Sequence, residues 1–288
     1  MQLLDGKKIA ETLKAQLKEE VALIKDKDGV VPKLVNIIIG DDAGSCAYAN
    51  SQKRVAESIG IDYELKSLEA NCTQETFVEL IKTLDNDVSV NGIMLHKPVP
   101  KQIDYSVVAN YVDVNKDIEG INVANIGKMI LGETNIIPCT PASVMEHIKS
   151  THVNLRGKEV VVVGASHIVG KPLSILLLEE MATVTVCHVG TSEAGNLEEH
   201  VKRADVLIVA VGVPALIKGD WIKEGSIVVD VGINRVDGKI VGDVEFETAK
   251  KKAAYITPVP GGVGPVTVLL LMRNGIEAYR TQKRLQRK

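Results

Sequence analysis

The sequence predicts an α/β protein of two three-layer domains around a cleft, with parallel sheets. Three observations lead to this class: a length of 288 residues, a repeated alternation of β-branched runs with amphipathic stretches, and two separate series of that alternation. A chain of this length usually exceeds one hydrophobic core. Strands that alternate with helices form parallel sheets through right-handed crossovers.

The bulk composition narrows the classes of partner. Hydrophobic residues make up 45% of the chain and charged residues 25%, which is typical of a globular protein. The formal net charge of -3 gives no electrostatic reason to expect nucleic acid or an anionic membrane as partner. We therefore expect small-molecule ligands.

The cysteines and the chain start indicate the compartment. Cys46, Cys72, Cys139 and Cys187 lack the close spacings of zinc sites or redox pairs, so we expect free thiols and no metal. The first residues do not form a secretory signal, and no apolar run is long enough and free enough of charge to cross a bilayer. These features predict a cytoplasmic protein.

The first series of elements begins with a helix that Asp5 can cap. Its apolar positions recur at helical spacing, at Ile9, Leu13, Leu17 and Val21. We then expect a strand over 34–39, a helix that ends near 59, a strand over 63–68, a helix over 74–84 and a strand over 92–95.

A second series follows His147. It comprises strands over 160–163, 183–187, 206–211 and 227–231, helices over 172–181 and 197–203, and a final helix over 266–280. The final helix is long enough to return to the first domain. We therefore expect one domain from residues 1–149 plus 266–288, and a second from 150–265.

The segment from Val160 to Pro172 has the character of a phosphate-binding loop. A buried strand ends at Gly164, and a helix with proline in its first turn starts near Gly170. This order directs unpaired N–H groups and the positive helix end at a phosphate, and glycine lets the backbone approach. The spacing is not G-x-G-x-x-G, so a simple turn is the alternative. If this loop binds a dinucleotide, we expect the second domain to have a Rossmann-like fold.

The end of the following strand bears on the choice of dinucleotide. NAD-specific sites usually place an acid here for the ribose hydroxyls. The chain has Cys187-His188-Val189-Gly190-Thr191 instead. The missing acid favours NADP and leaves NAD possible.

Several motifs together resemble one family nearly end to end, the methylenetetrahydrofolate dehydrogenase/cyclohydrolases. They are Ser45-x-x-Tyr48, Pro98-Val99-Pro100, Lys116-Asp117-Ile118-Glu119-Gly120, Pro138-Cys139-Thr140-Pro141, Gly164 to Pro172, Asp230-Val231-Gly232-Ile233-Asn234, Val241-Gly242-Asp243-Val244, and Pro258 to Pro265. The resemblance implies a folate-binding domain, a Rossmann-like dinucleotide domain, and a homodimer formed largely through the latter.

The resemblance also implies the site residues. For catalysis they are Tyr48, Gln52, His96 and Glu119; for substrate binding, Pro98, Asp117, Pro260, Gly261 and Gly262; for the cofactor, Gly164, Ala165, Ser166, Gly170, His188, Thr191 and Ile233. Lys116 and Asp117 could equally pair with each other as a structural feature.

Three catalytic positions depart from the family pattern. Gln52 stands where the family has a lysine one helical turn after the tyrosine, His96 replaces a glutamine, and Glu119 replaces an aspartate. Hydride transfer mainly requires positioning of substrate and cofactor. Hydrolysis of the methenyl product also requires a group that changes charge, and the Gln52 amide cannot do so.

We therefore predict a dehydrogenase that passes a hydride from 5,10-methylenetetrahydrofolate to NADP, giving 5,10-methenyltetrahydrofolate, with cyclohydrolase activity weak or absent. One alternative is a fully bifunctional enzyme in which His96 relays protons. A second is a non-catalytic nucleotide-binding protein.

Overall fold

The computed structural model describes residues 1–134 and 136–287. It divides into two compact units. The six-stranded unit comprises residues 1–11 and 138–267, and the three-stranded unit comprises residues 12–137 and 268–288. Each contains parallel strands and helices, which confirms the predicted α/β class.

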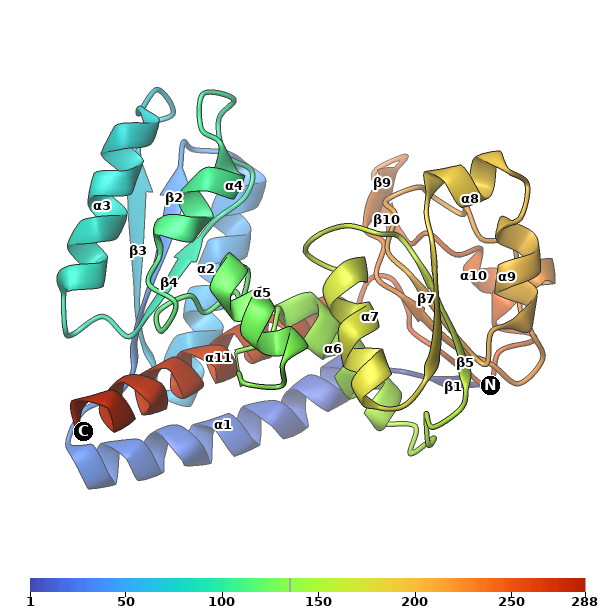
Figure 1. The fold of residues 1–288 in the computed structure, drawn as a ribbon, viewed down its shortest axis with the longest axis horizontal. Coiled ribbons are helices and arrows are strands. Elements are labelled where there is room, and N and C mark those ends of the chain that lie inside the picture. Colours follow the sequence, from blue (N-terminus) through green and yellow to red (C-terminus); the bar gives the residue numbers. More distant parts are fainter. Residues whose placement is uncertain (135, 288) are drawn as a thin grey trace. The chain divides into compact units, whose positions relative to one another are not determined.

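The sheet of the six-stranded unit is parallel throughout, in the order β1-β11-β8-β7-β5-β6. Its strands β1, β5 and β7 are labelled in Figure 1. The strands are β1 (Gln2–Leu3), β5 (Glu159–Val163), β6 (Thr183–Cys187), β7 (Val206–Val209), β8 (Ile227–Asp230) and β11 (Tyr255–Ile256). A short antiparallel hairpin, β9 (Asn234–Val236) and β10 (Lys239–Val241), lies outside the sheet.

Helices cover both faces of this sheet because its strands are apolar on both sides. Val160 and Val162 point into one core, with α6 (Cys139–Lys149) and α7 (Gly170–Glu179). Val161 and Val163 point into the other, with α9 (Leu197–Arg203) and α10 (Phe246–Ala249). The remaining helices are α8 (Val189–Glu193) and the 3₁₀ turn η2 (Gly219–Trp221). Alternate side chains of a strand face opposite sides, so this is the predicted three-layer, Rossmann-like arrangement.

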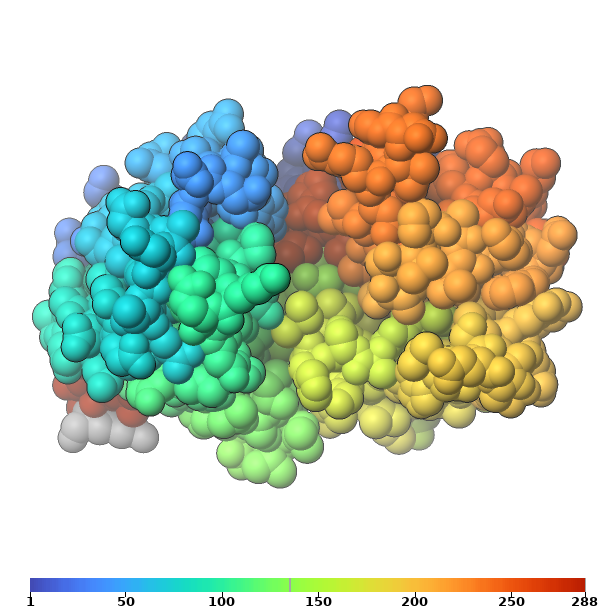
Figure 2. All heavy atoms as spheres, turned by 90° about the horizontal axis from the view of Figure 1, so that it is seen from above, coloured from blue at the N-terminus to red at the C-terminus, as the bar shows by residue number. Residues whose placement is uncertain are grey.

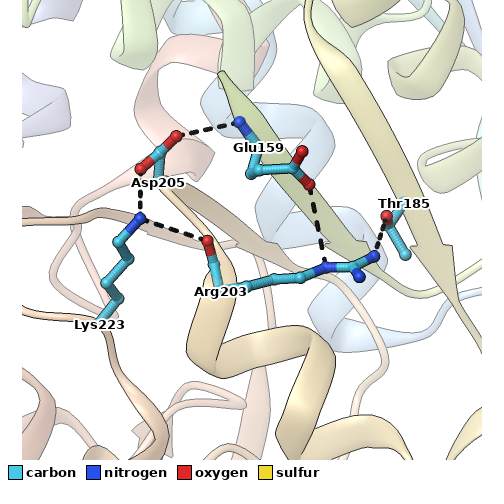
Figure 3. Close-up of polar contacts among 5 residues, drawn as sticks. All are labelled: Glu159, Thr185, Arg203, Asp205 and Lys223. Carbon is cyan, nitrogen blue, oxygen red and sulfur yellow. Dashed lines mark hydrogen bonds and ion pairs between the residues drawn. The ribbon is translucent and has the colours of Figure 1, made fainter. Parts of the chain in front are cut away.

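A polar cluster ties the strand starts of this unit together (Figure 3). The Asp205 carboxylate accepts the Glu159 backbone N–H at 3.0 Å and pairs with Lys223 at 2.6 Å. Arg203 contacts the Glu159 carboxylate at 3.9 Å and donates to the Thr185 hydroxyl at 2.8 Å. These contacts join β5, β6 and the entry to β7 at the edge opposite the strand ends discussed below.

The three-stranded unit has a parallel sheet in the order β3-β2-β4. Its elements are β2 (Lys33–Ile39), β3 (Asp62–Leu68), β4 (Gly92–Leu95), α2 (Ala43–Ile59), α3 (Gln74–Asn86), α4 (Tyr105–Val108), the 3₁₀ turn η1 (Ala109–Tyr111) and α5 (Val123–Ile130). Helices α1 (Gly6–Asp28) and α11 (Val263–Gln286) each contribute residues to both units.

The two faces of β2 differ in character. Val35, Ile37 and Ile39 pack with α3 in an apolar core. The opposite face carries Asn36, which is fully buried and bonded to α2. A buried polar residue in the central strand therefore marks the α2 side of the sheet.

The structure corrects the expected domain boundary in two places. Residues 138–149 form α6, whose side chains belong to a core of the six-stranded unit. Residues 1–11 also belong to that unit, because β1 pairs with β11 through Gln2 and Leu3. The final helix starts at Val263, three residues before the expected 266. Two-residue strands are too short to show a sequence period, which is why β1 and β11 were not expected.

The four cysteines are free thiols. In the part of the chain that the structure describes, no helix combines the length and apolar character needed to cross a membrane, and no group of three or more His, Cys, Asp or Glu side chains is placed to hold a metal ion.

Lys116 is a buried lysine that caps a helix. Its side chain is 7% exposed, and its ammonium donates to the carbonyls of Leu84, Asp85 and Asp87 at 3.0, 2.7 and 2.8 Å. These carbonyls lie at the C-terminal end of α3, where a cation is favourable. Lys116 therefore joins α3 to the strand-end loop that carries Asp117 and Glu119.

Replacing Lys116 with methionine should destabilise the protein by about 2 kcal/mol, because three carbonyls lose a charged donor. Urea denaturation of the purified protein measures this. Lys101→Met is the matched control, since Lys101 is exposed. Equal stability of the two variants would contradict the capping role.

Candidate functional site

The expected catalytic residues gather in the three-stranded unit, near the ends of β2 and β4. Helix α2 begins after Asp42, whose Oδ2 accepts the backbone N–H of Ser45 at 2.8 Å and its hydroxyl at 2.9 Å. This cap sets the start of the helix that carries Tyr48 and Gln52 one turn apart. The rings of Tyr48 and His96 lie 5.8 Å apart at 49°.

Gln52 is an interior residue, with 1% of its surface exposed. Its Oε1 accepts from Asn36 Nδ2 at 3.0 Å and from the Tyr63 hydroxyl at 3.1 Å. Its Nε2 contacts Met94 Sδ at 3.6 Å. Neutral groups therefore contact both the oxygen and the nitrogen of the amide, and the side chain is not a surface group. Asn36 and Tyr63 were not expected, because nothing local in the sequence connects them to position 52.

His96 follows β4 and is 4% exposed. Its backbone N–H donates to Ile37 O at 2.9 Å. Within the described residues, its buried Nδ1 has no hydrogen-bond partner. Burial lowers the pKa of the imidazole, and the Asp42 carboxylate opposes this in part. A neutral imidazole at pH 7 results.

Glu119 combines a fixed position with an altered pKa. Its Oε2 accepts the Leu95 N–H and the Tyr105 hydroxyl, both at 3.1 Å. Burial, with the nearby Asp117 charge, raises the pKa of the carboxyl from 4.5 to about 7, against the opposing effect of Lys97. The Lys97 ammonium lies 3.7 Å from the centre of the Tyr105 ring. Glu119 is thus a carboxyl that can gain or lose a proton near neutral pH.

Asp117 shapes the turn that presents Glu119. Its carboxylate accepts the N–H groups of Gly120 and Asn122 and the Asn125 amide, at 3.1, 2.9 and 2.9 Å. Asp117 is 3% exposed. The contacts of Lys116 and Asp117 with backbone groups explain the Lys-Asp-x-Glu-Gly motif without a pairing between the two. Pro98, beyond His96, follows a cis peptide bond.

In the six-stranded unit, the predicted loop lies between β5 and α7. A Cβ on Gly164, where φ is 123°, would lie 2.3 Å from Ala210 O, and a Cβ on Gly170 would lie 1.8 Å from Gly164 O. Both positions therefore require glycine. Ser166 is exposed between them, its Oγ accepts the Val169 N–H at 3.2 Å, and Ala165 is partly exposed.

The other expected cofactor residues follow neighbouring strands of the same sheet. His188 comes directly after β6 and is exposed, and its N–H donates to Thr191 Oγ1 at 3.2 Å. Ile233 follows β8 and is 70% exposed. The carboxyl ends of parallel strands share one sheet edge, which is where ligands of such sheets bind.

Two buried aspartates organise this edge, and the sequence reasoning did not single them out as functional. Asp230 accepts the N–H groups of Gly232, Asp243 and Val244. Asp243 in turn accepts those of Val211 and Gly212 and the Asn234 amide. A Cβ on Gly232 would meet the Asp243 carboxylate at 2.2 Å, and one on Gly242 would meet Asp230 Oδ2 at 1.9 Å. The Asp-Val-Gly-Ile-Asn and Val-Gly-Asp-Val motifs therefore form one hydrogen-bond network. The presence of a Gly within two residues of an Asp in both motifs was the sequence signal that could have identified it.

The Pro258–Pro265 segment packs closely against other parts of its unit. The Gly6 N–H donates to Gly261 O at 3.0 Å, and a Cβ on Gly6 would lie 1.8 Å from Gly262 O. Pro260 follows a cis peptide bond and is exposed. Gly6 and Gly262 thus have a packing role, since a Cβ on Gly262 would lie 2.7 Å from Pro258 O, whereas Pro260 is exposed.

The raised pKa of Glu119 predicts a pH-dependent stability. Between pH 4.5 and 7 the folded protein holds a proton that the unfolded chain releases. The stability from this proton is complete below pH 4.5 and is lost as the pH rises through 7. Urea midpoints at pH 5 and pH 8 should therefore differ more in the wild type than in Glu119→Gln. Equal differences would contradict the raised pKa; Asp230, raised to about 6, is present in both proteins and cancels.

Comparison with known proteins gives consistent matches along the chain. Residues 4–119 match the tetrahydrofolate dehydrogenase/cyclohydrolase catalytic domain, and residues 138–283 match the NAD(P)-binding domain of the same family. The bifunctional protein FolD of Bacillus pumilus is 49% identical over 279 residues, which cover 96% of this chain and 97% of that protein.

Solved structures agree. The bifunctional FolD methylenetetrahydrofolate dehydrogenase/cyclohydrolase of Campylobacter jejuni has a TM-score of 0.94 at 42% identity, covering 98% of this chain and 99% of that one. The Trypanosoma brucei dehydrogenase-cyclohydrolase, complexed with NADP cofactor and inhibitor, has a TM-score of 0.92 at 37% identity and 97% coverage of each chain. These matches confirm the resemblance inferred from the motifs: the chain belongs to the tetrahydrofolate dehydrogenase/cyclohydrolase family.

Proposed function

We propose that the protein oxidises 5,10-methylenetetrahydrofolate by hydride transfer to NADP, and that it hydrolyses the methenyl product only weakly. The oxidation is supported by family membership along the chain. The weak hydrolysis is supported by one observation: the family's lysine position holds Gln52, which lies in a neutral hydrogen-bond network.

The residues of the six-stranded unit suit a dinucleotide. The Gly164–Gly170 loop passes so close to neighbouring backbone that a Cβ would clash at either glycine, and the start of α7 that follows it favours a pyrophosphate. His188 and Thr191 follow β6, where no acid from 187 to 192 would repel the 2′-phosphate of NADP. When bound, NADP supplies the hydride acceptor. The relative from Trypanosoma brucei, complexed with NADP, supports this choice.

The two half-reactions make different demands on the folate site. Hydride departure leaves a cation that the folate itself stabilises, so Tyr48, Gln52 and Glu119 need only bind and orient the substrate. Hydrolysis adds water to that cation and moves protons as the ring opens. General acid–base help contributes ~10²–10⁴-fold in rate, and an amide cannot supply it. A neutral position 52 also avoids repulsion of the cationic product.

Paired assays test this proposal. The purified protein should reduce NADP with methylenetetrahydrofolate, and its conversion of methenyl- to 10-formyltetrahydrofolate should stay near the spontaneous rate. Gln52→Lys should increase the hydrolysis, since it returns a group that can change charge. Absence of NADP reduction would instead favour a nucleotide-binding protein without catalysis.

Full bifunctionality is the second candidate, because the relatives are named bifunctional and His96 is a neutral imidazole whose buried Nδ1 has no hydrogen-bond partner among the described residues. Fast hydrolysis by the wild type would favour it over weak hydrolysis. In that case His96→Ala should abolish hydrolysis and spare most of the hydride transfer.

We also propose that the protein is a homodimer formed through the sheet edge at β6. Strand β6 is the last in its sheet, and Val186 on it, Leu178 and Met181 are exposed apolar residues beside this edge. The segment of β6 and α8, yellow to gold in Figure 2, lies at the surface. Unprotected strand edges with apolar side chains tend to pair with another chain.

Val186→Lys should therefore shift the protein toward the monomer, because a charge would be buried at the edge. Light scattering after size-exclusion chromatography measures the mass. Val88→Lys, at an apolar position that is 84% exposed in the other unit, is the matched control. A dimer that survives Val186→Lys would place the interface elsewhere.

A further inference from the structure

Three neighbouring strands direct the side chains of Asn36, Tyr63 and Met94 toward the Gln52 amide. In the sheet register Asn36 lies opposite Met94 on β4 and Leu65 on β3, and Leu34 lies opposite Tyr63. Side chains two residues apart on a strand share a face, so Asn36, Tyr63 and Met94 all point to the α2 side. There they surround Gln52, whose amide contacts all three. The residues come from four elements and form one buried cluster.

The contacts determine which way the amide points. The Met94 sulfur offers only lone pairs, so the NH₂ end of Gln52 must face it at 3.6 Å. The oxygen then accepts from both Asn36 and Tyr63, which are the donors at the other end. A rotated amide would set its oxygen against the sulfur. The Met94 contact uses one of the two N–H groups of Nε2, and within the described residues the second makes no hydrogen bond.

Asn36 is maintained at a cost in stability. Its side chain is fully buried, and its Oδ1 has no partner among the described residues. A buried acceptor without a hydrogen bond destabilises the fold, because it has given up its contact with water. An apolar side chain would avoid that cost in an otherwise apolar strand. The asparagine is therefore explained by the hydrogen bond that its Nδ2 donates to Gln52.

We propose that Asn36 and Tyr63 are positioning residues of the folate site, which clamp the oxygen of Gln52 so that its N–H₂ group is a fixed, uncharged donor to the substrate. This inference rests on the proposed function. It assigns to two residues outside the family motifs a part in substrate binding, and it makes position 52 a binding group in place of a proton carrier.

Tyr63→Phe tests the clamp with the smallest change, because it removes one donor and keeps the ring. We expect the KM for methylenetetrahydrofolate to rise ~2–10-fold, the effect of one hydrogen bond, with kcat changed less than about 2-fold. Asn36→Leu, of similar size, should have the same effect. Tyr111→Phe, at an exposed tyrosine outside the site, is the matched control and should leave both constants unchanged.

The decisive measurement repeats Tyr63→Phe in a Gln52→Leu background. If Tyr63 acts through Gln52, Tyr63→Phe should alter KM by less than about 2-fold in the Gln52→Leu protein. Equal effects in both backgrounds, or a lowered melting temperature with unchanged KM, would overturn the clamp. A wild type that does not oxidise methylenetetrahydrofolate would overturn the proposed function as well, so the two failures are distinguishable.

Discussion

The contacts of the Gln52 amide are the constraint on which the chemistry of the three-stranded unit depends. Asn36 and Tyr63 donate to its oxygen and the Met94 sulfur faces its nitrogen, so the side chain of α2 at this position is neutral and fixed. Burial at 1% exposure makes a charge there expensive unless it is paired. The network thus favours a site that binds and orients a folate over one that moves protons through position 52.

Proton transfer near neutral pH remains available elsewhere in the same unit. Burial of the Glu119 carboxyl raises its pKa to about 7, although the hydrogen bonds from Leu95 and Tyr105 to one of its oxygens act in the opposite direction. His96 is neutral for the same physical reason. Relative to the family pattern, the helix position 52 therefore loses an ionisable group, the position after β4 gains one in His96, and position 119 keeps a carboxyl. This distribution is consistent with oxidation as the principal activity.

Buried carboxylates that bind backbone N–H groups position the loops in both units. Asp117 holds the turn before α5, and Asp230 and Asp243 hold the loops after β7 and β8. Each satisfies several donors that would otherwise be buried without partners. The exposed Asp42 carboxylate accepts the Ser45 N–H at the start of α2. Many residues of the motifs that indicate the family therefore fix the geometry of loops. The candidate ligand-binding residues lie on or beside these loops.

The sequence alone determined strands and helices such as those over 183–187, 197–203 and 92–95, because hydrophobic period and turn residues are local signals. It also indicated the glycine loop and the unusual residues of the folate site. Only the tertiary structure decided the boundary at residue 138, the two-residue strands, and the surroundings of Gln52. Asn36, Tyr63 and Met94 reach Gln52 from separate strands, and a contact between residues far apart in sequence leaves no pattern within a single segment.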